Sequence, residues 1–288
     1  MNKACFFMLI MLLFAGSVVS AETLKIMQVS DVHYSLDDNN SGSRALSESR
    51  ENLKRVITKI NARKDVDCVV FTGDNINVSK PEVLKEFGAQ VQELNKPYYI
   101  VLGNHDVGKA GGIKKEDYME YIKKINPNQK TASPNYVFYP SKHTKKIVGV
   151  VLDGTVPVVQ SKHGFFNDKT IDWLDKTLAK NKNHIVIIFQ HFPLVPPYDN
   201  YEHSVLEPEA YLNLLKKYDN ILFIASGHYH AAAVNQDESG IYHISTPSLV
   251  SNPKAIRLIE LNYNKRKLHK PSDVELKTEL IEIRSSYE

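Results

Sequence analysis

Cysteine is almost absent from this sequence, whose 288 residues contain only Cys5 and Cys68. Cys5 falls in an N-terminal segment that we expect to be cleaved, which leaves one cysteine and excludes an internal disulfide. Cys68 begins the apolar run Cys68-Val69-Val70-Phe71 and is predicted to be a buried, inert strand residue. The mature chain must therefore be stabilised by its hydrophobic core, helped by any metal ion that it binds.

The sequence also lacks an excess of charge of one sign. The formal net charge is +3, and acidic and basic residues are mixed along most of the chain. Such a balance gives no electrostatic footprint of a nucleic-acid-binding protein. The one basic cluster, Lys265 to Lys270, favours a solvated turn between strands over a functional patch.

Long apolar runs are missing except at the N-terminus. There Lys3 precedes the apolar run Ala4–Phe14, and Val19-Ser20-Ala21 suits signal peptidase. The alternative is an uncleaved membrane anchor, because the stretch approaches the ~20 residues that span a bilayer. Ser17 and the lack of a basic flank favour cleavage, so we expect export to the periplasm or beyond. Residues 22–288 should then contain no membrane span.

Apolar runs of strand length alternate along the chain with segments of helical period. The predicted strands are Leu24–Val29, Cys68–Thr72, Tyr98–Leu102, Ile147–Leu152, Ile185–Gln190 and Ile221–Ser226. Between them, apolar residues recur at the three- and four-residue spacing of a helix with one buried face, as at Leu53, Val56, Ile57 and Ile60. Continuous apolar strands are those that are buried on both faces. The alternation predicts an α/β layered domain.

The C-terminal part of the chain has a different pattern. Ile241–Ser245, Ala255–Tyr263 and Val274–Ile283 follow one another without a helical segment, and the last two alternate like half-buried antiparallel strands. Residues 107–134 are predicted to form an irregular connection that contains one short helix near Tyr118–Ile125. Since no repeat or linker is visible, we expect residues 22–288 to form one domain.

Five of the six predicted strands end in clusters of residues that can ligate metals. The clusters are Ser30-Asp31-Val32-His33, Gly73-Asp74-Asn75, Gly103-Asn104-His105-Asp106, Gln190-His191-Phe192-Pro193 and Ser226-Gly227-His228-Tyr229-His230. Ligands of open α/β sheets bind in the crevice outside the carboxyl ends of the strands, so the clusters can converge on one site. The glycines before Asp74, Asn104 and His228 are expected to allow the sharp turn from strand to loop.

One such cluster is weak evidence, because D-x-H and H-x-H occur often by chance, but five in succession predict a metal centre. In their order, D-x-H, G-D-x, G-N-H-D, a lone H and G-H-x-H resemble the calcineurin-like metallophosphoesterase superfamily, from about Leu24 to Tyr263. The resemblance implies a two-layered β-sandwich flanked by helices. It also implies a pair of divalent metal ions at the carboxyl ends of the strands.

The resemblance assigns a role to each residue of the clusters. It implies one metal ion held by Asp31, His33, Asp74 and His230, and a second held by Asp74, Asn104, His191 and His228. Asp74 would bridge the two ions, and His105 would face the substrate. Two divalent ions with only two carboxylates keep an excess of positive charge, which attracts a phosphate group. Imidazole and oxygen ligands without a thiolate suit Mn, Fe or Zn.

The expected activity is hydrolysis of a small phosphoester by a hydroxide held between the metal ions. The chain departs from purple acid phosphatases, which have a tyrosine where Asn77 stands, and it leaves no room for the extra domain of the large nucleotidases. His163-Gly164-Phe165-Phe166 is similar to the compact phosphodiesterases typified by cyclic-nucleotide enzymes. We therefore favour a phosphodiesterase. The alternatives are a broad-specificity phosphomonoesterase and a catalytically silent exported protein that binds metal or nucleotide.

Four further residues have roles that the sequence leaves open. Asp153 follows a strand at the same sheet edge, where it either contacts substrate or closes a turn. Asp106 either orients His105 or caps the next turn. Tyr198 and His203, in the loop that follows the fourth cluster, are candidates for a substrate wall.

Overall fold

Two β-sheets form the middle of the molecule. The computed structural model describes residues 22–37, 39–107, 111–156 and 161–283, and the predicted signal segment 1–21 lies outside them. The first sheet contains β1 (Glu22–Val29), β2 (Cys68–Thr72), β3 (Tyr98–Val101), β12 (Ala255–Tyr263) and β13 (Val274–Glu282), in the order β13-β12-β1-β2-β3. The second sheet contains β4 (Tyr136–Phe138), β5 (Ile147–Val151), β7 (Ile185–Phe189), β9 (Ile221–Ser226), β10 (Ala233–Gln236) and β11 (Tyr242–Ser245), in the order β10-β11-β9-β7-β5-β4.

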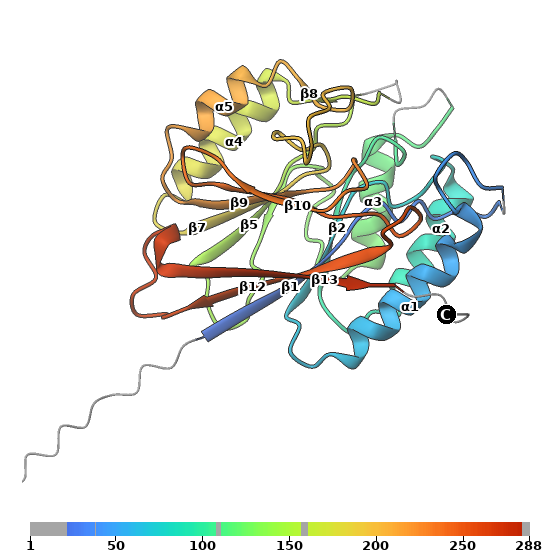
Figure 1. Ribbon diagram of the computed structural model, residues 1–288, viewed down its shortest axis with the longest axis horizontal. Coiled ribbons are helices and arrows are strands. Elements are labelled where there is room, and N and C mark those ends of the chain that lie inside the picture. Colours follow the sequence, from blue (N-terminus) through green and yellow to red (C-terminus); the bar gives the residue numbers. More distant parts are fainter. Residues whose placement is uncertain (1–21, 38, 108–110, 157–160, 284–288) are drawn as a thin grey trace, which may run out of the picture.

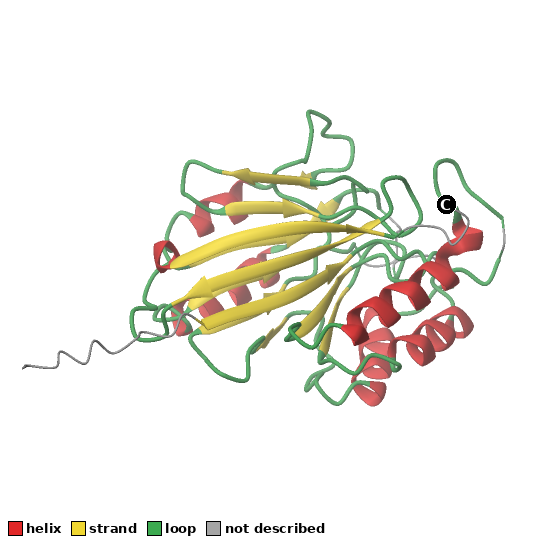
Figure 2. Ribbon diagram, turned by 60° about the horizontal axis from the view of Figure 1, so that its bottom comes forward, coloured by secondary structure: helices red, strands yellow, loops and turns green. Residues whose placement is uncertain are grey.

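Helices lie beside both sheets, as Figures 1 and 2 show. The first sheet is flanked by α1 (Ser49–Ala62), α2 (Pro81–Val91) and α3 (Lys115–Ile125), and the second by α4 (Asp168–Lys180) and α5 (Glu209–Leu215). Two 3₁₀ helices, η1 (Leu46–Glu48) and η2 (Pro271–Asp273), precede α1 and β13. A separate pair of short parallel strands is formed by β6 (Gly164–Phe165) and β8 (Val205–Leu206). The predicted two-layered sandwich flanked by helices is confirmed.

The alternation of side chains along the strands divides the core in two. In β5 and β7, Ile147, Ile185 and Ile187 belong to the large core that the two sheets share, which also contains α1 to α3. Their sequence neighbours Val148 and Val186 pack instead with the apolar face of α4 and α5. Because both faces are covered, these strands are apolar at every position, and each fully buried aliphatic side chain stabilises the fold by roughly 1.5–3 kcal/mol.

The strands that carry the polar clusters run parallel to their neighbours. β1 pairs with β2, and β2 with β3, in parallel register, and the same holds for β5, β7 and β9 in the second sheet. Their carboxyl ends therefore lie at one edge of each sheet. At the end of the chain, β12 pairs antiparallel with both β1 and β13, as the alternating pattern predicts.

The observed boundaries differ from the predicted ones by a few residues. All six predicted strands and the three C-terminal ones are present, and α3 begins at Lys115, three residues before the predicted Tyr118. The sequence did not reveal β4, β6, β8 and β10, because runs of two to four residues are too short to show a period. Among the described residues, no helix has the length and apolar character needed to cross a bilayer.

Candidate metal centre

The seven predicted metal ligands come together where the loops after β1, β2, β3, β7 and β9 meet. Asp74 lies in the middle, with its Oδ2 3.6 Å from Nε2 of His33 and 3.4 Å from Nε2 of His191. On one side, Nε2 of His230 is 3.4 Å from Oδ1 of Asp31. On the other side, Nε2 of His191 lies 3.2 Å from Oδ1 of Asn104 and 3.1 Å from Nδ1 of His228.

The backbone at these positions is unusual. Six non-glycine residues in the described part of the chain have a positive φ, and five of them are predicted ligands: Asp31 at 50°, His33 at 45°, Asp74 at 50°, His228 at 70° and His230 at 52°. The left-handed region costs an L-residue roughly 1–2 kcal/mol. Hydrogen bonds between loops hold the strained backbone in place, including His33 N to Asp74 O at 2.8 Å and Gly227 N to His191 O at 3.0 Å. Such strain is typical of functional sites.

The glycines that precede the ligands act in two different ways. Gly73 has a φ of 91°, so it makes the predicted sharp turn. Gly103 and Gly227 do not lie in the left-handed region, and a different reason for glycine applies at these two positions. A Cβ at Gly103 would lie 2.2 Å from Asp74 N, and one at Gly227 would lie 1.9 Å from Ser30 Oγ. These two glycines are required because a neighbouring loop approaches their backbone closely.

Three of the four predicted histidine ligands are anchored through one ring nitrogen, so that the other points into the site. Nδ1 of His191 lies 2.8 Å from Thr72 O, and Nε2 of His228 lies 2.8 Å from Lys162 O. Carbonyl oxygens only accept hydrogen bonds, so the anchored nitrogens carry the protons. Nδ1 of His230 lies 2.9 Å from Ser251 Oγ. This arrangement is typical of metal-binding histidines. The exception is His33, whose Nδ1 is buried without a hydrogen-bond partner among the described residues.

The donor atoms are arranged to bind a cation rather than to form hydrogen bonds with one another. When His191 and His228 are neutral, their facing nitrogens, 3.1 Å apart, both present lone pairs. Burial lowers the pKa of His191, but the Asp74 carboxylate outweighs it and raises the pKa to about 9, so a proton occupies this position in the metal-free protein. Burial lowers the pKa of His228 to about 3, assisted by the positive charge of His191. Oδ1 of Asp31 is buried and has no hydrogen-bond partner among the described residues.

Both aspartates are ionised and each directs one oxygen to the centre. Burial raises the pKa of Asp31, but the positive charge of His230 outweighs it and the pKa falls to about 2. Burial acts in the same way on Asp74, and the positive charge of His191 holds the pKa well below its usual range. Oδ2 of Asp31 accepts a hydrogen bond from His228 N at 2.9 Å, and Oδ1 of Asp74 accepts one from His105 N at 2.8 Å.

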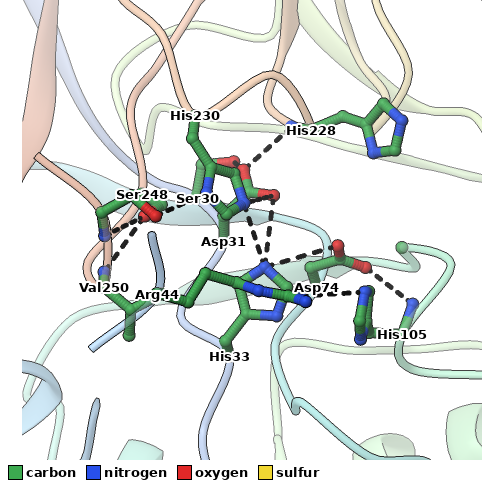
Figure 3. Close-up of polar contacts among 12 residues, drawn as sticks. Ser30, Asp31, His33, Arg44, Asp74, His105, His228, His230, Ser248 and Val250 are labelled. Atoms are coloured by element: carbon green, nitrogen blue, oxygen red, sulfur yellow. Dashed lines mark hydrogen bonds and ion pairs between the residues drawn. The ribbon is translucent and has the colours of Figure 1, made fainter. Parts of the chain in front are cut away.

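The donor atoms fall into two principal groups that could each hold a metal ion. One group consists of Asp31, His33 and His230, and the other of Asp74, His191 and His228. Each contains three of the four residues of a predicted ligand set: Asp74 is missing from the first group, and Asn104, with its Oδ1 3.2 Å from Nε2 of His191, is missing from the second. His105 forms a third group with His33 and Asp74, although Nη1 of Arg44 donates a hydrogen bond to its Nε2 at 3.2 Å (Figure 3).

Asp106 does not orient His105. Instead, Nδ1 of His105 lies 2.8 Å from the carbonyl oxygen of Asn77. The carboxylate of Asp106 accepts hydrogen bonds from the backbone of Gly103 at 2.8 Å and of Ile76 at 2.9 Å. Its role is therefore to hold the loops after β2 and β3 together, which is neither of the two alternatives that the sequence left open.

A cleft with a volume of about 340 Å³ opens above the metal centre. Tyr198 and His203 line it, as predicted, and their rings lie 5.5 Å from Tyr229 and 5.4 Å from His228. Asp153 does not line the cleft. Its carboxylate accepts hydrogen bonds from Lys115 Nζ at 2.6 Å and from the backbone N–H of Thr155 at 2.9 Å, which makes it a turn residue.

Several residues of the cleft were not found from the sequence. Arg44, Ser43, Lys162 and Tyr229 also line it. Tyr229 lies inside the G-H-x-H cluster, so its position at a strand end can be read from the sequence, but the motif itself assigns no role to its aromatic side chain. Arg44, Ser43 and Lys162 lie in loops without a periodic pattern, and no sequence signal indicates them.

Comparison with known proteins agrees with this geometry. The sequence model of the calcineurin-like phosphoesterase family matches residues 24–232. The chain belongs to this family and is a metal-dependent phosphoester hydrolase.

Individual relatives are distant. The chain is 27% identical over 215 residues to a probable glycerophosphodiester phosphodiesterase of Arcobacter nitrofigilis, covering 71% of each chain. It is 23% identical over 237 residues to a 3',5'-cyclic adenosine monophosphate phosphodiesterase of Vibrio vulnificus, covering 81% of this chain and 79% of the relative. A dimetal phosphatase from Danio rerio has a similar structure, with a TM-score of 0.68 and 18% identity, covering 91% of this chain and 99% of that one. At 18% sequence identity, this comparison shows that the two proteins share a fold.

Proposed function

We propose that the protein is a phosphodiesterase that works with two divalent metal ions, Mn, Fe or Zn. The observation that carries the proposal is the convergence of seven donor side chains from five strand ends, in two groups that meet at Asp74. One ion would be held by Asp31, His33, Asp74 and His230, and the other by Asp74, Asn104, His191 and His228.

The protein's own groups prepare the site for this chemistry. When bound, divalent ions polarise phosphoryl oxygens and make water a nucleophile at neutral pH. The hydrogen bonds to Thr72 O and Lys162 O keep the rings of His191 and His228 turned toward the centre. His105, held by Asn77 O, faces the cleft beside Asp74 and is placed to contact a phosphoryl oxygen.

The cleft favours a diester over a monoester. Tyr198, His203 and Tyr229 form an aromatic wall next to His228 (rings of Tyr198 and Tyr229 5.5 Å apart), and it offers an apolar surface to a second organic group. A monoester has no such group to place there. The names of two similar relatives, both described as phosphodiesterases, support the same preference.

Turnover of two chromogenic substrates tests the proposal. The metal-loaded protein should hydrolyse bis(p-nitrophenyl) phosphate with a higher kcat/KM than p-nitrophenyl phosphate, and Tyr198→Ala should reduce the preference. A higher kcat/KM for the monoester would favour the phosphomonoesterase. Metal binding without turnover of either substrate would favour the silent binding protein.

We further propose that residues 1–21 are a signal peptide and that the protein is exported to the periplasm or beyond. The short positive start, the apolar run and Val19-Ser20-Ala21 support this proposal. Mass spectrometry of the protein from its own cells should find Glu22 at the N-terminus. A chain that keeps residues 1–21 would indicate an anchor.

A further inference from the structure

Arg44 reaches the metal centre from a loop that is tied down on both sides. Backbone hydrogen bonds join Ser41 and Arg44 in both directions, at 3.1 and 3.0 Å, across a tight turn in which Gly42 has a φ of 57°. The next residue, Ala45, donates a hydrogen bond to Val250 O at 2.7 Å. These contacts hold the backbone of Arg44 at the rim of the cleft, so its guanidinium is positioned before substrate arrives.

The guanidinium of Arg44 has no acidic partner among the described residues. Within the described part of the chain, its side-chain hydrogen bond runs from Nη1 to Nε2 of His105 at 3.2 Å (Figure 3), which leaves its other donors available to the cleft. A half-buried arginine usually pairs with a carboxylate, and its planar fork suits the oxygens of a carboxylate or phosphate. A neutral imidazole is a weak partner for it. The missing anion is therefore expected from the substrate.

The charges around the cleft indicate how much negative charge the substrate carries. Asp74 is the one acidic residue among the described residues that line the cleft, and it is engaged at the metal centre, whereas Arg44 and Lys162 add two positive charges. A simple phosphodiester has one negative charge, and the metal centre attracts it. Arg44 and Lys162 then have no counter-charge.

We propose that Arg44 is a substrate-binding residue that recognises a second negative charge at the phosphate end of the substrate. This rests on metal-dependent phosphoester hydrolysis, which the phosphodiesterase proposed above shares with its phosphomonoesterase alternative, and it narrows the substrate class. Two kinds of substrate supply such a charge next to His105. One is a diphosphate diester, which agrees with the phosphodiesterase proposed above and whose second phosphate would bind Arg44. The other is a monoester, whose phosphoryl group is itself doubly charged and which would replace the proposed phosphodiesterase by the alternative phosphomonoesterase.

Three substrates separate these cases: bis(p-nitrophenyl) phosphate with one charge, p-nitrophenyl phosphate with two charges on one phosphorus, and ADP-ribose with two linked phosphates. Arg44→Ala should lower kcat/KM for a doubly charged substrate about 10- to 100-fold more than for the singly charged one, the size expected for one charge-assisted hydrogen bond. Arg44→Lys should recover part of this loss, because it restores the charge without the fork.

The matched control is Arg63→Ala, which removes the same charge from an exposed ion pair with Asp65 (2.9 Å) far from the cleft. This variant should leave the ratios of kcat/KM between the three substrates unchanged. Thermal unfolding and elemental analysis should show that Arg44→Ala keeps its fold and its metal ions. A selective loss on p-nitrophenyl phosphate supports a monoester, and one on ADP-ribose supports a diphosphate diester. An equal loss on all three substrates, or no loss, overturns the proposal for Arg44. If the unaltered protein hydrolyses none of them, the proposed function itself fails.

Discussion

Gly103→Ala should disable the metal centre although it changes no ligand. An ideal Cβ at this position would lie 2.2 Å from the backbone nitrogen of Asp74 and 2.3 Å from its Oδ1. Ordinary contacts begin at 3.4 Å, so the two loops must separate by about 1 Å. Asp74 cannot yield easily, because His33 N donates to its carbonyl oxygen at 2.8 Å and His105 N to its carboxylate at 2.8 Å.

The size of the effect follows from this displacement. A shift of about 1 Å at a catalytic group costs roughly 10²-fold in rate, and forcing a methyl group into a packed position typically costs ~1–3 kcal/mol of folding free energy. Because Asp74 is shared by both groups of donors, Gly103→Ala should also weaken metal binding at both positions. The measurements are kcat/KM, metal content by elemental analysis, and thermal unfolding.

Gly240→Ala is the matched control. Gly240 lies in the turn between β10 and β11 with a φ of 85°, and the nearest atom to its Cβ would be 3.9 Å away. Its substitution should cost about 1–2 kcal/mol of stability through the left-handed backbone alone, and it should leave kcat/KM unchanged. If Gly103→Ala kept full turnover and full metal content, the argument from close approach would be refuted.

Four other predictions concern the metal centre and the core. Chelation should abolish hydrolysis and Mn, Fe or Zn should restore it; undiminished turnover by metal-free protein would contradict the assignment. Asp74→Ala should lose two equivalents of metal and His33→Ala chiefly one, by elemental analysis. His105→Ala should keep both metal ions while turnover of an alkyl ester falls ~10²–10⁴-fold, and full retention would exclude a catalytic role. Burial lowers the pKa of His243 despite its hydrogen bond to Asp237, so the unfolded chain binds a proton more readily. The free energy of unfolding should therefore fall as pH drops below ~6.5, and it should fall less in the His243→Gln variant than in the unaltered protein. Identical pH profiles of the two metal-free proteins would refute this.

The strands and the ligand clusters could be predicted because both depend on local features. β2, β7 and β9 are buried at every position, so their sequences are continuous apolar runs. A polar cluster directly after such a run must lie at the strand end, and parallel strands place these ends together.

Other features depend on contacts between distant parts of the chain, and the sequence does not show them. Arg44 lines the cleft from a loop whose next residue, Ala45, bonds to Val250, some 200 residues away. Asp153 follows β5 at the expected edge, yet its carboxylate pairs with Lys115 of α3 and does not line the cleft. The need for a glycine at position 103 also cannot be predicted from the sequence, because it arises from the close approach of the loop that contains Asp74.

The left-handed backbone at five of the seven predicted ligands bears on any attempt to transfer this centre to another protein. A graft that copied the side chains of Asp31, His33, Asp74, His228 and His230 onto ordinary loops would aim them in the wrong directions, since φ between 45° and 70° sets the Cα–Cβ vectors. The template to transplant is a set of main-chain dihedral angles together with the inter-loop bonds that enforce them.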